Sequence, residues 1–435
     1  MHRLGSAIQM EVVMPRWLIA SLLLAVTSAL APPATQAPAD LKKSAPTKEE
    51  TPLEERGFFG ILPGADSKSG LIVEEVTPDG PAAKAGVKDG DKIIKLNDKE
   101  VKNSDELRKR LGNTKPGQTL AVTIKRGDKE MMIRVTLGKR PAFAGVRVDA
   151  EPDKGFSWAY YLYVPVKLRD RSAAKTCTIL VRPNNTGQID DDAAVHGRAA
   201  RNDVTDLQSF ADRLAVVVLE PTFPRPKSDW QIYTHALNRA TLLTDKPRLV
   251  RIDRQLEAMI DHAAARLAAE GMAVDHRVLL FGFSASGMFA NRFTFLHPER
   301  IKAAAIGSPG GWPLAPASYW HGKTLPYPIG VADVEAVAGK PFDAAAAARV
   351  PMFLFMGDQD TNDSVIFRDS YSKSDENLIG ELFGKTPVSR WPFAERLYRE
   401  VLPRAIFKEY PGVGHKVTKQ MLADVQAFFA SELAK

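Results

Sequence analysis

Cysteine is almost absent from this chain of 435 residues, in which Cys177 is the only one. A single thiol excludes an intrachain disulfide and any metal site built from cysteines. Cys177 lies in "TCTILV", an apolar run typical of a strand, and we expect its side chain to be buried. Stability must therefore come from packing, and the length allows two or three domains with full cores.

A hydrophobic run long enough for a comfortable membrane span is also lacking. The segment "WLIASLLLAVTSALA" follows Arg16 and ends in small residues. This pattern predicts an export signal over residues 1–31, with one cleavage site after "VTS" and an uncleaved anchor as the alternative. Export without disulfides is typical of bacterial envelope proteins. We therefore expect a periplasmic or secreted protein with no stable membrane span after cleavage.

An excess of one charge sign is lacking as well. The formal net charge is +7, and basic residues alternate with acidic ones, as in "KRGDKEMMIR". Interleaved charges indicate solvated faces, so we expect no nucleic-acid partner. Residues 32–55 are rich in Pro, Ala and charge without periodicity, which predicts a disordered linker.

Residues 56–140 consist of short alternating runs separated by turns that contain glycine. The segments "GFFGI", "GLIVEEV", "GPAAKAGVKDGDKIIKLNDKEV" and "SDELRKRLGN" together resemble a bacterial PDZ domain of the kind found beside envelope proteases. The resemblance implies a small β-rich domain that binds the C-terminal peptide of a partner protein by adding a strand to a sheet edge. It places the peptide carboxylate at the backbone N–H groups of Phe58, Phe59 and Gly60. The alternative is an empty groove in a domain that only packs against its neighbour.

From residue 144 to the end, apolar strand patterns alternate with longer helical patterns. This rhythm predicts an α/β domain with a mainly parallel sheet and helices on both faces. The strand candidates are "SWAYYLYVPV", "CTILVRP", "LAVVVLEP", "RVLLFGFS", "IKAAAIGS", "PMFLFMGD" and "AIFKEYPG". The helix candidates are "LVRIDRQLEAMIDHAAARLAAEG", "SGMFANRFTFLHP" and "TKQMLADVQAFFASELA".

Two serines lie in the turn of "VLLFGFSASGMFANRF", between a buried strand and a helix. Such a turn lies at the carboxyl edge of the sheet, where α/β proteins place their chemistry. A nucleophile elbow needs small residues two positions before and two after the serine. Ser284 has Gly282 and Ser286 there, whereas Ser286 would have the bulky Met288. Ser284 is thus the candidate nucleophile, and the alternative is that it only caps the helix.

A serine needs a base and an acid that orients the base. Downstream, "VPMFLFMGDQDTND" is an apolar strand that runs into an acidic turn, and "FKEYPGVGHKVT" places a histidine before the last helix. With this order, residues 144–435 resemble an α/β-hydrolase of the serine esterase or peptidase kind. The resemblance makes His415 the general base and favours Asp360 as the acid. Asp358 is then a turn residue, and Asp363 a helix cap or a partner of the acid.

An oxyanion hole needs two backbone N–H groups. One belongs to Ala285, which follows the nucleophile. The usual His-Gly motif is missing from "VRPNNTG", so the second donor stays open between Asn185 and Thr186, and the asparagines are alternatively turn formers.

Two further segments are candidates for covering the site. In the loop "TFPRPKSDWQIYTHAL", Trp230, Tyr233 and His235 either line a pocket or pin the loop. Residues 313–347 are an insertion long enough to form a cap over the site.

The function expected from these residues is that of an exported serine hydrolase that acts by acyl transfer on a small-molecule or polymeric ester. The "GFSASG" turn is most similar to esterases of the polyhydroxybutyrate-depolymerase and feruloyl-esterase kind. No metal and no organic cofactor is implied. The alternatives are a peptidase of the prolyl-oligopeptidase kind, although the propeller domain of that family is lacking, and a PDZ scaffold with a degenerate hydrolase shell.

Overall fold

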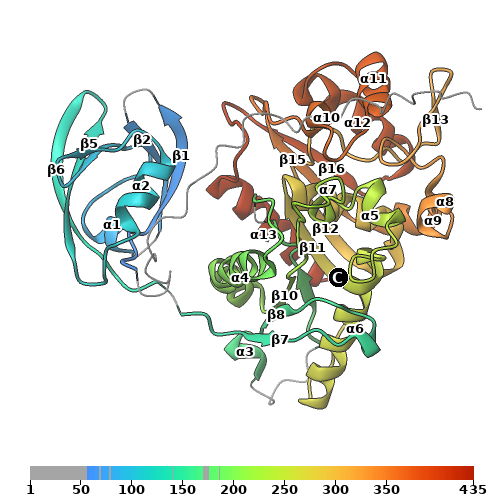
Figure 1. The fold of residues 1–435 in the computed structure, drawn as a ribbon, viewed down its shortest axis with the longest axis horizontal. Helices are drawn as coiled ribbons and strands as arrows, with labels where there is room; N and C mark the ends of the chain where they lie inside the picture. Colours follow the sequence, from blue (N-terminus) through green and yellow to red (C-terminus); the bar gives the residue numbers. More distant parts are fainter. Residues whose placement is uncertain (1–55, 68–69, 78–79, 141, 170–175, 186) are drawn as a thin grey trace, which may run out of the picture. The chain divides into compact units, whose positions relative to one another are not determined.

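The computed structural model describes residues 56–67, 70–77, 80–140, 142–169, 176–185 and 187–435 of the chain (Figure 1). The predicted export signal and the predicted linker, residues 1–31 and 32–55, lie outside the described residues. In the part that is described, no helix combines the length and the apolar character that crossing a bilayer would need.

The first domain is the predicted small β-rich domain, and it consists of an antiparallel sheet with two short helices. Its strands are ordered β1-β2-β3-β5-β6, and β4 pairs with β3. Alternate residues of β5 (Leu120, Val122 and Ile124) are buried, because successive side chains of a strand point to opposite faces. The elements are β1 Ile61–Ser67, β2 Gly70–Val76, α1 Pro81–Lys84, β3 Lys92–Leu96, β4 Lys99–Glu100, α2 Ser104–Leu111, β5 Thr119–Arg126 and β6 Lys129–Thr136.

The second domain is built on an eight-stranded sheet with the order β16-β15-β12-β11-β9-β10-β8-β7. Strands β9 to β16 of this sheet pair in parallel, whereas β8 is antiparallel to both of its neighbours. This order, in which β9 and β10 exchange places, is that of an α/β-hydrolase sheet. The strands are β7 Val146–Val148, β8 Tyr160–Tyr163, β9 Ile179–Val181, β10 Val217–Pro221, β11 Val278–Phe283, β12 Ile301–Gly307, β15 Met352–Gly357 and β16 Ala405–Tyr410.

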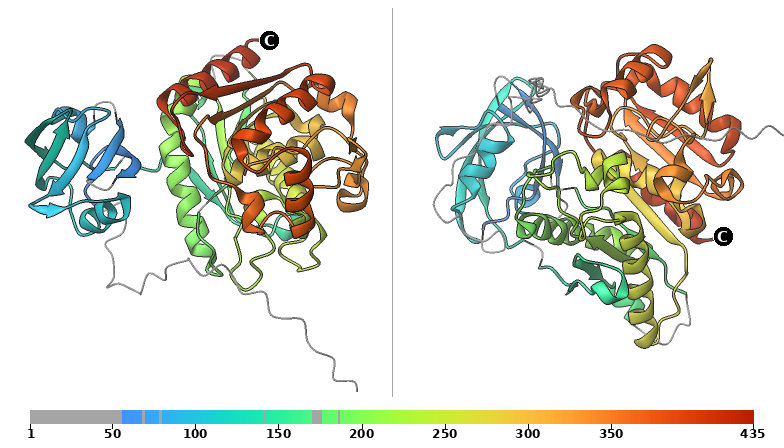
Figure 2. Two further views of the ribbon diagram at one scale, coloured as in Figure 1. Left: turned by 90° about the horizontal axis from the view of Figure 1, so that it is seen from above. Right: turned by 45° about the vertical axis from the view of Figure 1, so that its right-hand side comes forward.

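Helices cover both faces of this sheet (Figure 2). The neighbours Leu279 and Leu280 of β11 show the division, because they belong to different apolar clusters. Leu279 packs with α4 (Ala193–Leu214) and α13 (Lys419–Leu433). Leu280 packs in the cluster that contains α6 (Ile252–Ala269), α7 (Ala285–Leu296) and α12 (Pro387–Val401). The prediction of an α/β domain with helices on both faces of the sheet is confirmed. Shorter helices are α3 Val166–Arg169 and α5 Arg239–Leu243.

Helix α4 was not among the predicted helices. Its Gly197 and its many charged residues obscure a narrow apolar face, whose buried members include Ala200, Val204 and Phe210. The helix begins at Asp192, whose side chain accepts a hydrogen bond of 2.8 Å from the Ala194 N–H. An apolar face this narrow becomes recognisable only when the sheet that it covers is known.

The predicted insertion, residues 313–347, forms a hairpin and short helices, and its role as a cap stays a prediction. A second insertion between β15 and β16 carries α10, α11 and α12. Residues of both insertions share one apolar cluster with Ala285 and Met288 of α7, and the rings of Trp312 and Phe383 stack at 4.1 Å within it. The elements are β13 Tyr319–Trp320, β14 Lys323–Thr324, α8 Val334–Ala338, α9 Ala344–Arg349, α10 Ser364–Phe367 and α11 Lys373–Leu382.

Candidate active site

Ser284 lies at the sharp turn between β11 and α7. Its φ of 61° and ψ of −124° are rare for a residue with a side chain, and such strain persists only where the surroundings enforce it. The Ser284 N–H donates to the Gly307 carbonyl at 3.0 Å, which ties the turn to the neighbouring strand β12. This is the local geometry of a nucleophile elbow, in which the hydroxyl is lifted above the sheet edge.

The small residues around Ser284 are required by a close approach of the backbone to itself. A Cβ atom on Gly282 would lie 2.0 Å from the carbonyl oxygen of Ser286. The Ser286 hydroxyl accepts from the Phe283 N–H at 3.0 Å and donates to the Phe283 carbonyl at 2.8 Å. Ser286 is fully buried. Of the two serines, Ser286 therefore braces the turn, and Ser284 is left to reach other groups.

Ser284, His415 and Asp360 are brought together by the fold. The Oγ of Ser284 lies 2.9 Å from Nε2 of His415. The Nδ1 of the same ring lies 2.9 Å and 3.1 Å from the two carboxylate oxygens of Asp360. The ring of Phe283 packs against the imidazole at 4.9 Å between centroids. These contacts have the distances that a nucleophile, its base and the orienting acid require.

The carboxylate of Asp360 is buried but well supported. Burial by itself raises the pKa of Asp360, but hydrogen bonds from His415 and from the Asn362 N–H at 2.9 Å outweigh it and hold the pKa below its usual value. Asp360 is therefore ionised at neutral pH. An ionised carboxylate accepts the Nδ1–H of His415 and leaves the Nε2 lone pair for the Ser284 hydroxyl.

The other acids of the turn have structural partners. Asp358 accepts a hydrogen bond of 2.7 Å from the Gly412 N–H, which fixes the loop that carries His415. Asp363 caps α10 and forms a buried ion pair of 2.7 Å with Arg390. The expected turn and cap roles of these two residues agree with those contacts.

Three residues that support the site were not singled out from the sequence. A Cβ on Gly357, at the end of β15, would lie 1.9 Å from the Val413 carbonyl oxygen, so the histidine loop lies directly on the strand end. Arg182, which follows β9, reaches the Ser286 hydroxyl at 3.4 Å. Asn362 supplies the N–H to Asp360. A glycine at a strand end just before an acidic turn is a sequence signal for such a close approach.

The oxyanion donors remain a prediction. Ala285 is the first residue of α7, where helix N–H groups lack an acceptor within the helix. The side chain of Asn185 accepts from the Gly187 N–H at 3.3 Å, which is a turn contact, and its own N–H remains a candidate. Thr186 lies outside the described residues.

The loop after β10 is held together by its polar and aromatic side chains. His235 is buried, and its Nε2 donates a hydrogen bond of 2.8 Å to the Phe223 carbonyl. The side chain of Asn184, whose contact was not predicted from the sequence, donates to the same carbonyl at 2.8 Å. Burial lowers the pKa of His235 to about 3, so this ring is neutral. Tyr233 is buried too, whereas Trp230 is only partly buried. The pinning interpretation therefore fits Tyr233 and His235.

The predicted carboxylate loop of the first domain has one N–H that is already bonded. The Phe58 N–H donates to the Gly138 carbonyl at 2.8 Å. For Phe59 and Gly60, no N–H acceptor occurs among the described residues. If a peptide carboxylate binds here, these two N–H groups rather than all three are its partners.

The comparisons with known proteins identify the first domain. The family model described as the PDZ domain matches residues 49–137. The N-terminal domain is a PDZ domain. This domain is 39% identical over 88 residues to the serine endoprotease DegS of Haemophilus influenzae, a match that covers 20% of this chain and 26% of that protein. It is 35% identical over 91 residues to a probable periplasmic serine endoprotease DegP-like of Marinomonas sp., covering 21% and 19%. The chain thus spans about a quarter or less of the length of these relatives.

Solved structures resemble the second domain at low identity. Poly(aspartic acid) hydrolase-1 from Sphingomonas sp. KT-1 matches with a TM-score of 0.46 and 20% identity, covering 66% of this chain and 98% of that one. The poly(3-hydroxybutyrate) depolymerase LpqC from Bordetella parapertussis matches with a TM-score of 0.45 and 19% identity, covering 67% and 94%. The α/β-hydrolase fold of this domain follows independently from its strand order and its elbow.

Proposed function

We propose that the chain is a serine hydrolase that works through an acyl-enzyme. The observation that carries the proposal is the continuous contact from Asp360 through His415 to the Oγ of Ser284, on a strained turn between strand and helix. A helix cap accepts from a backbone N–H of the first turn, and the Ser284 side chain makes no such bond. The geometry therefore favours the nucleophile over the cap.

In the proposed reaction, the Ser284 oxygen attacks a carbonyl carbon while His415 Nε2 takes the hydroxyl proton. His415 then gives this proton to the leaving group, and an acyl-enzyme remains. Water enters by the same route in reverse, with His415 again as the base. Asp360 keeps the ring in its tautomer and stabilises the imidazolium. The Ala285 N–H, at the positive end of α7, is the proposed first oxyanion donor.

The proposed substrate is a carboxylic ester, small or polymeric. Support comes from the "GFSASG" turn, which resembles esterases, and the fold holds this turn in the elbow geometry. Peptide hydrolysis uses the same residues and is the alternative that a substrate screen separates.

We also propose that the PDZ domain binds the C-terminus of a partner protein and that the chain acts in the periplasm or outside the cell. The N–H groups of Phe59 and Gly60 support the first point. The second point is supported by the curated relatives of the PDZ domain, one of which carries "periplasmic" in its name.

Covalent labelling tests the hydrolase proposal. A fluorophosphonate probe reacts only with an activated serine, so the wild type should be labelled stoichiometrically and Ser284→Ala not at all. Ser286→Gly is the matched control and should still be labelled, because it keeps a small residue at the crowded position of the elbow. Labelling of Ser284→Ala at the wild-type rate would show that the nucleophile lies elsewhere. No labelling of the wild type would favour the scaffold alternative.

A further inference from the structure

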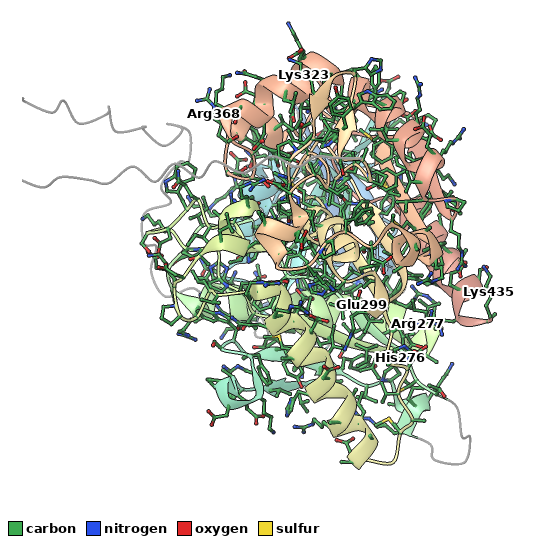
Figure 3. The ribbon with its side chains drawn as sticks, turned by 90° about the vertical axis from the view of Figure 1, so that its right-hand side faces the viewer. His276, Arg277, Glu299, Lys323, Arg368 and Lys435 are labelled. Carbon is green, nitrogen blue, oxygen red and sulfur yellow. The ribbon has the colours of Figure 1, made fainter. Side chains whose placement is uncertain are left out.

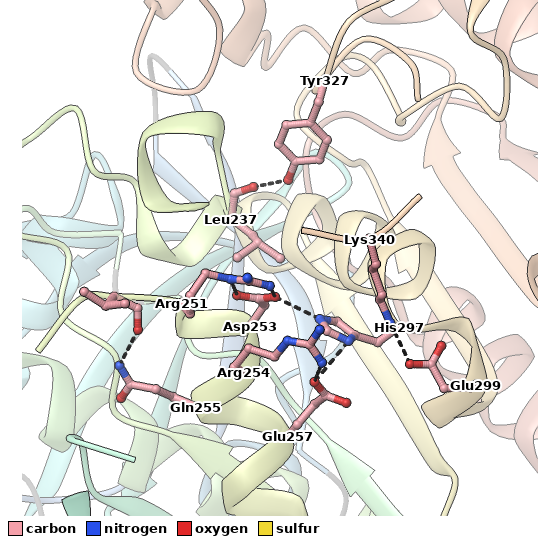
Figure 4. Close-up of polar contacts among 11 residues, drawn as sticks. Leu237, Arg251, Asp253, Arg254, Gln255, Glu257, His297, Glu299, Tyr327 and Lys340 are labelled. Atoms are coloured by element: carbon pink, nitrogen blue, oxygen red, sulfur yellow. Dashed lines mark hydrogen bonds and ion pairs between the residues drawn. The ribbon is translucent and has the colours of Figure 1, made fainter. Parts of the chain in front are cut away.

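His297 is fully buried where α7 ends and meets α6, and both of its ring nitrogens face carboxylates (Figure 4). Its Nε2 lies 3.0 Å from Oδ2 of Asp253, which is also fully buried. The guanidinium of Arg251 holds both oxygens of Asp253, at 2.9 Å and 2.6 Å. Because a carboxylate paired with a guanidinium only accepts, it is the Nε2 of His297 that carries the proton and donates.

The other nitrogen of His297 has no such partner. Nδ1 is buried and makes no hydrogen bond among the described residues, although Oε2 of Glu257 lies only 3.1 Å away. A contact of this length without hydrogen-bond geometry sets a nitrogen lone pair against carboxylate lone pairs. Such an arrangement is favourable only when a positive charge, that of a bound metal ion or of a proton on Nδ1, lies between the two atoms.

Glu299 completes a set of three donors. It lies two residues after His297, in the short turn Pro298–Arg300. The nearest donor atoms of Glu257, His297 and Glu299 all lie within 4.8 Å of one another. One imidazole nitrogen and two carboxylate oxygens suit zinc, which binds such atoms at about 2.0–2.2 Å and keeps a fourth position for water.

We propose that Glu257, His297 and Glu299 form a zinc-binding site that ties α6 to the turn after α7. Asp253 is its supporting residue, because histidines that bind metals donate their second N–H to a carboxylate in this way. The sequence predicted no metal, and the site contains none of the residues of the proposed reaction. It therefore stands or falls independently of that reaction.

Two basic side chains compete with the ion. Arg254 lies 2.7 Å from Oε2 of Glu257, with its side chain 45% exposed. Lys340 lies 2.7 Å from Oε1 of Glu299, with its side chain 31% exposed. Pairs at the surface contribute little, so they can yield to a dication, but they lower its affinity. This competition predicts the direction of one change in affinity: removal of the Lys340 charge should strengthen zinc binding.

Titration calorimetry of the full chain with Zn²⁺, after treatment with a chelator and dialysis, tests the site. We expect one equivalent to bind the wild type with micromolar affinity and to raise the melting temperature. Glu299→Gln should weaken binding by about tenfold or more, because it removes one ligand. This side chain is 51% exposed, so the variant should still fold. Lys340→Met should bind zinc several-fold more tightly than the wild type.

His276 provides the matched control, because it is another place where zinc could bind adventitiously. It is 79% exposed and its Nδ1 lies 3.5 Å from Asp275. Figure 3 labels both His276 and Glu299. His276→Ala should bind zinc as the wild type does. The proposal is overturned if the wild type shows no saturable binding, if Glu299→Gln binds like the wild type, or if His276→Ala is the variant that loses the ion.

Discussion

The sheet domain contains two histidine–aspartate pairs in which the aspartate is buried, and the two rings differ in what their second nitrogen contacts. His415 contacts Asp360 at 2.9 Å, and His297 contacts Asp253 at 3.0 Å. Both aspartates are almost completely buried, with 2% and 0% of the side chain exposed. A buried aspartate therefore orients each of the two rings.

The difference lies in the third group and in access. The second nitrogen of His415 meets the Ser284 hydroxyl, and the ring is 19% exposed. The second nitrogen of His297 meets the carboxylate of Glu257, and the ring is fully buried. A hydroxyl beside a histidine can give up its proton and attack a substrate, whereas a carboxylate beside a buried ring nitrogen suits the binding of a cation. In the two proposals, an aspartate orients each histidine ring, and the third group determines whether the ring serves as a base or as a metal ligand.

The largest effect should come from removing the third group of the reactive pair. Ser284→Ala should lower turnover of a soluble ester by about 10⁶-fold, because the three residues act as a unit. Circular dichroism should show an unchanged fold. Turnover within tenfold of the wild type would remove Ser284 from the reaction and end the contrast between the two pairs.

Exchanging the two aspartates for asparagine sharpens the comparison. Asp360→Asn should keep the fold and lower turnover by about 10⁴-fold, since the ring loses its correct tautomer. Asp253→Asn should instead lower the free energy of unfolding by about 3 kcal/mol, because Arg251 loses its buried partner. Its turnover per folded molecule should fall less than tenfold. The checks are kinetics and urea denaturation of both variants, and a reversal of the two effects would contradict the assignment.

A smaller effect is expected from the close contact that holds the His415 loop. Gly357→Ala would bring a methyl group to 1.9 Å from the Val413 carbonyl, so the loop must move away from Ser284. We expect turnover to fall by about 10²-fold, as for a displacement of about 1 Å in other enzymes. Gly414→Ala is the control, because its Cβ would meet its nearest neighbour, the Gln359 carbonyl, at 3.8 Å. Equal losses in the two variants would refute this role of Gly357.

His235 extends the comparison to a buried histidine without a carboxylate. Its folded pKa of about 3 lies below the unfolded value near 6.5, so between these values the unfolded chain binds one more proton. Stability contributed by the neutral ring is complete above about pH 6.5 and falls as the pH drops toward 3, by about 1.4 kcal/mol per unit at most. Urea denaturation at pH 7 and 5 should show this loss in the wild type, and His235→Gln should lose about 1.4 kcal/mol less per unit. An identical slope in both proteins would show that His235 is not neutral.

The smallest effect should follow from removing the PDZ domain. Its core is a separate apolar cluster within residues 59–137, so deletion of residues 56–140 should leave a folded hydrolase. Turnover of a small ester should stay within about twofold of the wild type.

The isolated domain should bind C-terminal peptides with micromolar affinity, about −8 kcal/mol. An amidated peptide should bind much more weakly, because its charge-assisted hydrogen bonds are lost. If no peptide binds and the remaining hydrolase unfolds, the domain is a structural brace.

Much of the fold could be predicted from the sequence because the central strands are continuous apolar runs that end in chemically distinctive turns. Ser284 and Asp360 each follow such a strand, His415 follows the edge strand β16, and parallel strands bring their carboxyl ends to one edge. Helix α4 was missed because its buried face is narrow. The second insertion was missed because the apolar faces of its helices are divided between the sheet-side cluster and the cluster shared with the first insertion.

Contacts between segments that are distant in the chain could not be predicted from the sequence. Nothing in the residues around His297 shows that α6 places Asp253 and Glu257 against it, because both lie on an ordinary amphipathic helix. The approach of Val413 to Gly357 likewise depends on how two loops fold over a strand end. Local patterns therefore singled out the three residues of the proposed reaction, but the groups that hold them in place could be seen only in the structure.

The single cysteine gives this protein a built-in reporter of sheet opening. Cys177 is 2% exposed, and its backbone forms an isolated β-bridge with Val274. It lies just before β9, a strand at the centre of the sheet. Burial also raises the pKa of its thiol. The folded state therefore resists alkylation for two reasons: the reagent cannot reach the sulfur, and little of the thiol is in the reactive thiolate form. With no other thiol in the chain, the rate of modification by an alkylating reagent measures how often this strand separates from its neighbours. Opening at the start of β9 can thus be timed in the intact protein, without any label on the PDZ domain.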